Sequence, residues 1–283
     1  MIIWIASYPK SGNTWIRSFL SSYLFSNKGE FNFNLLKNID QFWVRKQIDV
    51  NNDKISLQER IAQRWIPNQK LINADKKIHY LKTHSALCTI NGNKFTDKYN
   101  TRAAIYIVRD PRNITISLSN HYELKHSEAT DFITNKRKII FPKKQNQNNS
   151  NYEDFNFLGD WSGHYKSWKN NNFCPIKIIR YEDILGDTKN VFFSILEFLS
   201  KYTKIEIIGK KIENSINSTN FEILSKMEDE NNFPESSISS KNNKKIKFFN
   251  LGKNNDWKKL LDKSLSKKIE ESFKNEMIEL NYL

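Results

Sequence analysis

Residues 8–15, Tyr-Pro-Lys-Ser-Gly-Asn-Thr-Trp, bring together side chains that can bind a phosphate or a sulfate group. Lys10 carries a full positive charge, and the hydroxyl groups of Ser11 and Thr14 can donate hydrogen bonds. Gly12 has no Cβ atom, so the backbone can approach an anion closely at this point. The pattern is not a Walker A loop, because the lysine precedes the only glycine. The segment therefore predicts an anion-binding loop and argues against an ATPase or a GTPase.

Arg109-Asp110-Pro111 is a second segment suited to an anion, and Ser117 follows it in the chain. A guanidinium group can bind a phosphate through two parallel hydrogen bonds. Proline is favoured in the first turn of a helix, so we expect Ser117 on the helix that Pro111 opens, where it adds a hydroxyl group. Taken alone, the segment is more typical of a surface ion pair beside a turn.

Lys82-Thr83-His84 offers a candidate general base. A hydroxyl acceptor is a poor nucleophile at neutral pH, and an imidazole whose pKa lies near 6.5 can take its proton during the attack. A lone histidine at the end of a strand is usually structural, but the preceding strand and Lys82 favour a functional role. The other four histidines have no comparable context, and we assign no role to His79, His121, His126 or His164.

Four apolar runs predict the strands that must position these groups, at residues 2–6, 78–81, 103–108 and 176–179. Continuous apolar strands between helices are typical of a parallel sheet that helices cover on both faces. The first run leads into the anion-binding loop, and a helix is expected to start near Thr14. Strand, loop and helix in this order point backbone N–H groups at an anion.

Further helices are expected at residues 187–200 and from Asp256 to Met277, where apolar side chains recur at helical spacing. We therefore predict an α/β fold with a central parallel β-sheet flanked by helices and a P-loop-like phosphate-binding strand, loop and helix. A single domain over residues 1–283 is expected. The segments at about 136–154 and 228–247 lack apolar periodicity, which predicts either mobile surface loops or a lid over an acceptor.

The composition predicts a folded, basic protein. Of the 283 residues, 38% are hydrophobic, which is enough for a core. The net charge of +14 suits an anionic partner, although a lysine-rich solvated surface explains it equally well. Cys88 and Cys174 lie in unrelated contexts, so a reducing compartment is the simpler inference. The five apolar residues at the N-terminus are too few for a signal peptide or a membrane span, and we expect a cytoplasmic protein.

Together these motifs resemble the sulfotransferases that use 3′-phosphoadenosine-5′-phosphosulfate (PAPS). The 8–15 segment resembles their sulfate-donor loop, and Arg109 with Ser117 resembles the signature that binds the 3′-phosphate. Lys82-Thr83-His84 resembles the family's Lys-Thr-His, whose histidine is the general base. The resemblance thus implies catalytic roles for His84, Lys10 and Lys82. It implies cofactor binding by Lys10, Ser11, Gly12, Asn13, Thr14, Trp15, Arg109, Ser117, Tyr181, Thr219, Gly252 and Lys253.

The later matches to this family are weaker. Residues 180–183 resemble a segment whose tyrosine, here Tyr181, lies near the adenine, and Thr219 matches a threonine that hydrogen-bonds the base. Residues 252–258 resemble the loop that closes over the 3′-phosphate. Many members have Arg-Lys-Gly where this chain has Asn250-Leu251-Gly252, and Asn255 replaces the glycine before Asp-Trp. Two phosphate-binding charges are therefore missing, so either Lys247 or Lys253 replaces them or the loop binds the phosphate less tightly.

The resemblance implies transfer of a sulfuryl group from PAPS to a hydroxyl or amine acceptor, with release of adenosine 3′,5′-bisphosphate (PAP) and without a metal. Residues 159–168 resemble bacterial members that modify glycopeptides, so the expected acceptor is a small molecule, a glycan or a glycopeptide. The paired tryptophans of that segment are more typical of core packing. The alternatives are a P-loop-like phosphotransferase, a basic nucleic-acid-binding module, and a family member that has lost turnover. We expect no nucleic-acid partner, and the sequence does not determine the oligomeric state.

Overall fold

The computed structural model describes residues 1–45, 55–141 and 154–283, except residues 231, 232, 234 and 240 and the side chain of Lys253. The chain forms two compact units. Unit 1 contains residues 1–8, 39–107 and 135–178. Unit 2 contains residues 9–38, 108–134 and 179–283. The predicted single domain over residues 1–283 stays a prediction.

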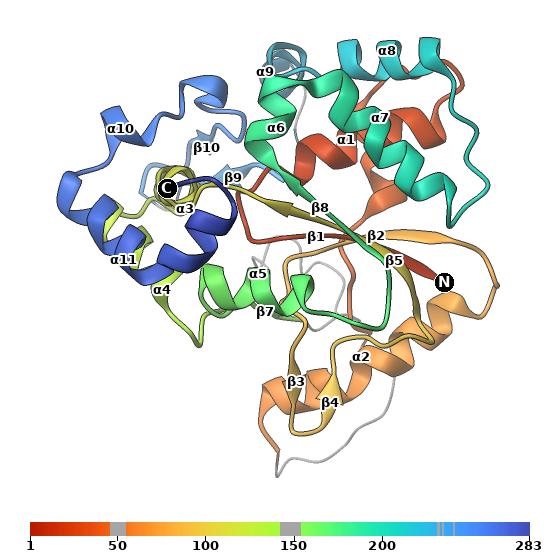
Figure 1. Ribbon diagram of the computed structural model, residues 1–283, viewed down its shortest axis with the longest axis horizontal. Helices are drawn as coiled ribbons and strands as arrows, with labels where there is room; N and C mark the ends of the chain where they lie inside the picture. Colours follow the sequence, from red (N-terminus) through yellow and green to blue (C-terminus); the bar gives the residue numbers. More distant parts are fainter. Residues whose placement is uncertain (46–54, 142–153, 231–232, 234, 240) are drawn as a thin grey trace. The chain divides into compact units, whose positions relative to one another are not determined.

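Four strands form the main sheet, in the order β2-β1-β5-β8 (Figure 1). They are β1 (Ile2–Ser7), β2 (His79–Thr83), β5 (Thr101–Val108) and β8 (Ile176–Arg180). β1 pairs in parallel with both β2 and β5, and all six of its residues are buried. These are the four strands that the apolar runs predicted. β2 extends further than expected, so Lys82 and Thr83 belong to the strand and His84 follows it directly.

Unit 1 covers one face of this sheet with aromatic side chains. The pairing of Trp4 with Ala104 and of Ala6 with Tyr106 places Trp4 and Tyr106 on the same face. The Trp4 ring packs against Phe42 and Phe95, and the Tyr106 ring packs against Trp168. The covering elements are α2 (Leu57–Asn73), the hairpin of β3 (Thr89–Ile90) and β4 (Asn93–Lys94), and α5 (Trp161–Lys169).

The two tryptophans of α5, Trp161 and Trp168, are fully buried. The prediction that they are core residues is therefore confirmed. Residues 136–141 and 154–157 include a short antiparallel pair, β6 (Ile139–Ile140) with β7 (Asn156–Phe157). The middle of the predicted 136–154 loop, residues 142–153, lies outside the described residues.

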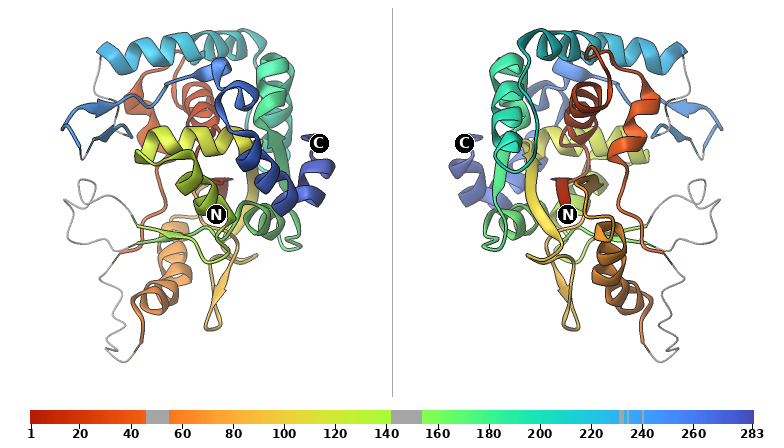
Figure 2. Two further views of the ribbon diagram at one scale, coloured as in Figure 1. Left: turned by 90° about the vertical axis from the view of Figure 1, so that its left-hand side faces the viewer. Right: turned by 90° about the vertical axis from the view of Figure 1, so that its right-hand side faces the viewer.

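Unit 2 contains the helix that follows the anion-binding loop, α1 (Asn13–Phe25), with α7 (Thr188–Ser200) and α8 (Gly209–Ser218) packed near it (Figure 2). A second group joins α3 (Pro111–Tyr122), α4 (His126–Thr134) and α11 (Lys263–Glu279). The remaining elements are η1 (Phe33–Ile39), α6 (Tyr181–Gly186), α9 (Phe221–Glu230), β9 (Ser237–Ile238), β10 (Lys245–Ile246), η3 (Gly252–Asn254) and α10 (Trp257–Leu260). The 228–247 segment includes the end of α9 and an antiparallel pair of strands, β9 and β10.

The expected helix from Asp256 to Met277 is wrong as a single element. Asp256 caps α10 by accepting from the backbone N–H of Lys258, but the chain leaves helical conformation at Leu261, where φ is −108° and ψ is 134°. Asp262 then serves as the N-cap residue of α11. Leu261 is buried in this extended conformation. The apolar period continues across the break, so the sequence pattern alone did not reveal it.

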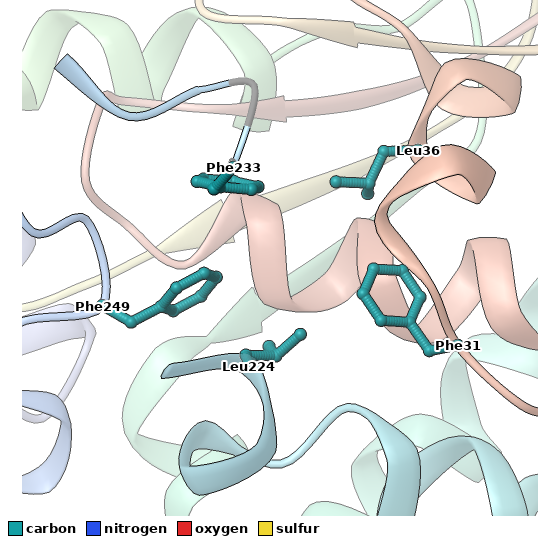
Figure 3. Packing of buried hydrophobic residues seen from close by; sticks show 5 residues of the cluster. All are labelled: Phe31, Leu36, Leu224, Phe233 and Phe249. Carbon is teal, nitrogen blue, oxygen red and sulfur yellow. The ribbon is translucent and has the colours of Figure 1, made fainter. Parts of the chain in front are cut away.

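A cluster of buried apolar side chains lies beside the anion-binding region of unit 2 (Figure 3). Its members come from four segments that are distant in sequence: Phe31, Leu36, Leu224, Phe233 and Phe249. Trp15, Phe221 and Phe248 pack against it and are partly buried. The cluster therefore anchors the start of α1 and the chain before Gly252 to a common core.

Candidate functional site

The loop between β1 and α1 has the backbone of an anion-binding loop. Lys10 and Gly12 both have positive φ, 66° and 98°. This conformation is uncommon for a residue with a Cβ atom and costs of the order of 1–3 kcal/mol at Lys10. Gly12 is the N-cap residue of α1 and offers no side-chain hydrogen bond to the first N–H groups of the helix. These N–H groups and the positive end of the helix dipole favour an anion here.

Tyr181 and Arg109 pack against one side of this loop. A Cβ atom at Gly12 would lie 2.4 Å from Cδ2 of Tyr181, so only glycine lets the ring pack there. The guanidinium carbon of Arg109 lies 4.2 Å from the centroid of the Tyr181 ring. Nη1 of Arg109 also donates to the backbone oxygen of Lys10 over 3.0 Å. The predicted residues of the first two motifs are therefore brought together in unit 2.

Ser117 and Asn255 extend this arrangement. Nη1 of Arg109 lies 3.3 Å from Oγ of Ser117, and Nδ2 of Asn255 donates to the same oxygen over 2.8 Å. Asn255 also donates to the backbone oxygen of Asn113 over 3.0 Å. From the sequence, Asn255 was noted only because it replaces a glycine of the family, and no role was predicted for it. The replacement of that glycine by a polar residue was the feature that could have identified Asn255.

Several buried polar atoms in unit 2 have no hydrogen-bond partner among the described residues. They include Oγ of Ser11, Nε1 of Trp15, Nε of Arg109 and Oδ1 of Asn255. Such atoms are rare in folded proteins, and a bound water, ion or ligand is one explanation for them. Three of the four are donors, which suits the phosphate and sulfate oxygens of a nucleotide such as PAPS.

Two residues of α1, Thr14 and Arg17, contact the segment that follows α9, and Lys10 of the loop contacts Phe248. Oγ1 of Thr14 donates to Oε2 of Glu235 over 3.0 Å, and Nη1 of Arg17 lies 2.5 Å from Oε1 of the same carboxylate. Nζ of Lys10 lies 3.8 Å from the centroid of the Phe248 ring. A nucleotide phosphate that binds Thr14 must therefore share or displace the contact with Glu235.

The other residues of unit 2 that were predicted to bind the nucleotide make contacts that do not by themselves indicate a binding site. The hydroxyl of Thr219 donates to the backbone oxygen of Ser215 over 2.6 Å, and its side chain is fully buried. Its contact with a base stays a prediction. Gly252 has a φ of 53°, and a Cβ atom there would lie 2.7 Å from the Phe221 ring. Lys247 pairs with Asp229 over 2.8 Å, and the side chain of Lys253 lies outside the described residues.

His84 lies in unit 1, directly after β2. Its Nδ1 atom is 2.8 Å from the backbone oxygen of Ser7, the last residue of β1. A carbonyl only accepts, so Nδ1 carries the proton in the neutral ring and Nε2 keeps the lone pair. The backbone N–H of His84 donates to Oδ1 of Asn156 over 3.3 Å. Lys82, in β2, pairs with Ile5 of β1. The imidazole is thus held with Nε2 in the form that a general base requires.

No group of three His, Cys, Asp or Glu residues that could hold a metal is found within the described ranges. Cys88 and Cys174 are free thiols, and burial raises the pKa of each to about 12. They are therefore protonated and poor nucleophiles at neutral pH. In the part of the chain that the structure covers, no helix is long and apolar enough to cross a membrane.

Comparison with known proteins gives one consistent family. The model of the sulfotransferase domain family matches residues 2–281. Sulfotransferase 1E1 of Mus musculus is 25% identical over 282 residues, which cover 96% of this chain and 82% of the relative. The amine sulfotransferase of Oryctolagus cuniculus is 23% identical over 280 residues, which cover 97% of this chain and 80% of the relative.

Solved structures share the fold. The mouse sulfotransferase SULT7A1 complexed with PAP superposes with a TM-score of 0.53 at 17% identity, covering 98% of this chain and 83% of that one. A retinol dehydratase in complex with androsterone and PAP gives a TM-score of 0.59 at 17% identity, covering 98% and 80%. These likenesses confirm the predicted α/β fold with a central parallel sheet flanked by helices. Because the family model spans nearly the whole chain, the chain belongs to the sulfotransferase domain family and is a PAPS-dependent sulfotransferase.

Proposed function

We propose that the 8–15 loop and Arg109 bind the two phosphate-bearing ends of PAPS and that His84 is the general base of the sulfuryl transfer. The observation that carries this proposal is the contact of Arg109 with both signatures at once. Its guanidinium group reaches the backbone of Lys10 and the hydroxyl of Ser117. Solved structures of the same fold that contain PAP support a nucleotide in this role.

The loop binds the 5′ end of the nucleotide, where the sulfate is attached. Backbone N–H groups at the start of α1, the hydroxyls of Ser11 and Thr14, and the ammonium of Lys10 are the donors. Oγ of Ser11 has no hydrogen-bond partner within the described residues, which supports this role. Asn13 and Trp15 follow in the same turn of α1, and we assign them to the nucleotide as the family motif does.

Arg109 and Ser117 bind the 3′-phosphate, with Asn255 supporting the hydroxyl of Ser117. Asn255 takes a place near this phosphate in a loop that lacks the family's arginine and lysine. Tyr181 stacks with Arg109 and lies next to the adenine, while Thr219, Gly252 and Lys253 keep their assignments from the resemblance. Binding then depends more on neutral donors, and we expect it to be weaker than in relatives that keep both charges.

The reaction is an in-line displacement at sulfur. A bond forms between the acceptor oxygen or nitrogen and sulfur, while the bond from sulfur to the bridging oxygen of the phosphosulfate breaks. Nε2 of His84 takes the acceptor proton, and PAP leaves with the bridging oxygen. Lys10 stabilises the negative charge that grows on that oxygen, and Lys82 assists from the strand before His84. Such a site accelerates the reaction mainly by positioning and electrostatics.

The acceptor is a small molecule with a hydroxyl or amine group. One relative is named an amine sulfotransferase, and two solved structures of the fold are complexes with androsterone or retinol. We also propose glycans and glycopeptides as acceptors, because residues 159–168 resemble bacterial members that modify glycopeptides. The free thiols of Cys88 and Cys174 support a reducing, cytoplasmic location.

A nucleotide screen tests the proposal first. In thermal-shift and calorimetric measurements, PAP should stabilise the protein by about 2.7 kcal/mol at 100 times its dissociation constant. ADP, ATP and a short oligonucleotide should give smaller shifts. PAP should bind at least about tenfold more tightly than AMP, since one charged bidentate contact contributes about 1.5–3 kcal/mol. Arg109→Ala should remove most of that preference, and equal affinities for PAP and AMP in the parent would contradict the 3′-phosphate site.

Turnover is then measured with PAPS and a panel of small phenols, alcohols and amines. Formation of PAP together with a product heavier by one SO₃ group is the expected result. A protein that binds PAP but produces no sulfated compound with any acceptor class would support the alternative of a family member without turnover.

A further inference from the structure

One face of α5 holds the backbone that carries His84. Nε2 of His164 lies 3.0 Å from the backbone oxygen of His84, and Nε1 of Trp168 donates to the backbone oxygen of Ser85 over 3.0 Å. Oγ of Ser167 accepts from the backbone N–H of Leu87 over 3.0 Å. Positions 164, 167 and 168 share one helix face, so three consecutive contacts fix the segment after β2.

We propose that His164 is a positioning residue for His84. The proposal rests on the role of His84 as the general base, and it goes beyond that role because nothing in the motifs or the relatives assigns His164 a function. His164 does not touch the reacting atoms. It acts through the carbonyl of His84, while the ring of His84 is held by Ser7.

The hydrogen bonds of His164 fix its tautomer. Its Nδ1 atom lies 2.8 Å from the hydroxyl of Tyr106, and its Nε2 atom faces a carbonyl. A carbonyl only accepts, so Nε2 carries the proton and Nδ1 accepts from the hydroxyl of Tyr106. Tyr106, His164 and His84 thus form a directed chain of hydrogen bonds that runs from β5 through α5 to the catalytic segment.

The surroundings of His164 keep it neutral. Its side chain is fully buried, with the ring of Tyr8 in an edge contact at 5.3 Å and the ring of Tyr106 at 5.7 Å. Burial lowers the pKa of His164 to about 4, although the carbonyl of His84 acts in the opposite direction. His164 therefore does not change charge in the range where His84 must work as a base. A fixed neutral donor suits a positioning role and excludes a proton-transfer role near neutral pH.

The unit contains a closely matched control. Gln69 is fully buried, accepts from the hydroxyl of Thr96 and donates to the backbone oxygen of Phe95 over 2.6 Å. His164 likewise accepts from a hydroxyl and donates to a backbone carbonyl. Loss of either residue removes the same kinds of buried bond, but only His164 contacts His84.

The test compares His164→Phe, His164→Gln and Gln69→Leu in the full chain. Phe keeps the ring but loses both hydrogen bonds, whereas the amide nitrogen of Gln can still donate to the carbonyl of His84. Using PAPS and 2-naphthol as the probe acceptor, we expect His164→Phe to lower kcat about tenfold or more and to leave PAP affinity within about threefold. Gln should restore most of kcat. Gln69→Leu should lower Tm to a similar extent with kcat unchanged well below Tm.

A spectroscopic readout does not depend on the acceptor or on turnover. Two-bond ¹H–¹⁵N spectra of labelled histidine should show the proton of neutral His84 on Nδ1 in the parent and a mixture of tautomers in His164→Phe. If that variant fails to fold, Tyr106→Phe, which removes only the hydroxyl bound to His164, should show the same change more weakly. An unchanged His84 tautomer together with unchanged kcat would overturn the proposal. Absence of turnover in the parent would contradict the proposed chemistry but would leave the spectroscopic test decisive for His164.

Discussion

Nδ1 of His84 lies 2.8 Å from the backbone oxygen of Ser7, at the point where β1 ends and the chain enters the anion-binding loop. The carbonyl fixes the proton of the neutral imidazole on Nδ1 and leaves Nε2 as the basic nitrogen. The contact joins the ends of two paired strands within unit 1, because Ser7 ends β1 and His84 directly follows β2. Ser7 therefore orients the ring of the proposed base. The contact also makes the role of His84 testable apart from nucleotide binding.

His84→Ala should separate chemistry from binding. We expect PAP affinity within about threefold of the parent and a turnover lower by about 10² or more, as for the loss of a general base. In the parent, turnover should fall at acid pH, because a protonated imidazole cannot accept a proton. Calorimetry with PAP and a pH profile of kcat are the measurements. Full turnover in the variant would make His84 structural.

Lys10 should contribute more to the transition state than to the bound product. Lys10 lies in the loop before α1, and its Nζ atom is 3.8 Å from the centroid of the Phe248 ring. An anion bound at the start of the helix attracts this ammonium group, and the attraction increases as negative charge grows on the bridging oxygen. Lys10→Ala should therefore reduce kcat by a larger factor than it weakens PAP binding. Lys10→Arg should recover only part of the rate, since a planar guanidinium cannot take the same position. A Lys10→Ala enzyme that turns over like the parent would show that the loop is a structural turn.

Asn255 should determine how well the site distinguishes PAP from AMP. Its amide occupies one lone pair of the Ser117 oxygen, and Arg109 approaches the other, so the hydroxyl proton of Ser117 remains to be donated. Asn255→Ala should lower the preference for PAP about fivefold, the equivalent of one neutral hydrogen bond. Asn214→Ala, which removes an amide donor to the backbone oxygen of Lys28, is the control and should change neither affinity. The measurement is the ratio of the dissociation constants of AMP and PAP in the parent and in each variant. An unchanged ratio in Asn255→Ala would contradict the role of Asn255.

Gly12→Ala should damage the loop through a clash as well as through backbone strain. The φ of 98° alone disfavours any Cβ atom, and the new methyl group would also meet the Tyr181 ring. Gly92 offers the control, because its φ is 82° and nothing lies within 4 Å of a Cβ atom there. Both variants should lose about 1 kcal/mol of stability from strain, whereas only Gly12→Ala should also weaken PAP binding. Equal PAP affinity in the two variants would remove Tyr181 and Gly12 from the site.

Acid should destabilise the protein through His164. The folded-state pKa is lowered from 6.5 to about 4 because the ring is buried, so between these values the unfolded chain binds a proton that the folded chain excludes. Stability is therefore present above the unfolded-state pKa and is lost as the pH falls from about 6.5 to about 4, by at most about 3 kcal/mol. Urea unfolding of the parent and of His164→Gln, compared at each pH, isolates this contribution. His126→Gln serves as the control, and a constant difference between parent and His164→Gln would contradict the pKa.

The order of the local elements around the main motifs could be predicted from sequence. The apolar runs gave the four strands, Pro111 marked the first turn of α3, and the 8–15 segment gave the loop between β1 and α1. Each of these signals is local, since strand propensity, proline geometry and the glycine of a tight loop act within a few residues. The break between α10 and α11 was missed because the apolar period runs through it.

Only the tertiary structure decided which distant residues support the motifs. His164 contacts the backbone of His84 across 80 positions, Asn255 contacts Ser117 across 138, and Glu235 contacts Thr14 across 221. A single sequence contains no periodic pattern that predicts such pairs, because the residues come together only when helices and loops pack in the folded chain. The sequence by itself therefore determined the family and the fold class, because both follow from local motifs and apolar runs. The packing determined which neutral side chains contact the proposed base and the proposed phosphate-binding residues, because those contacts join residues far apart in the chain.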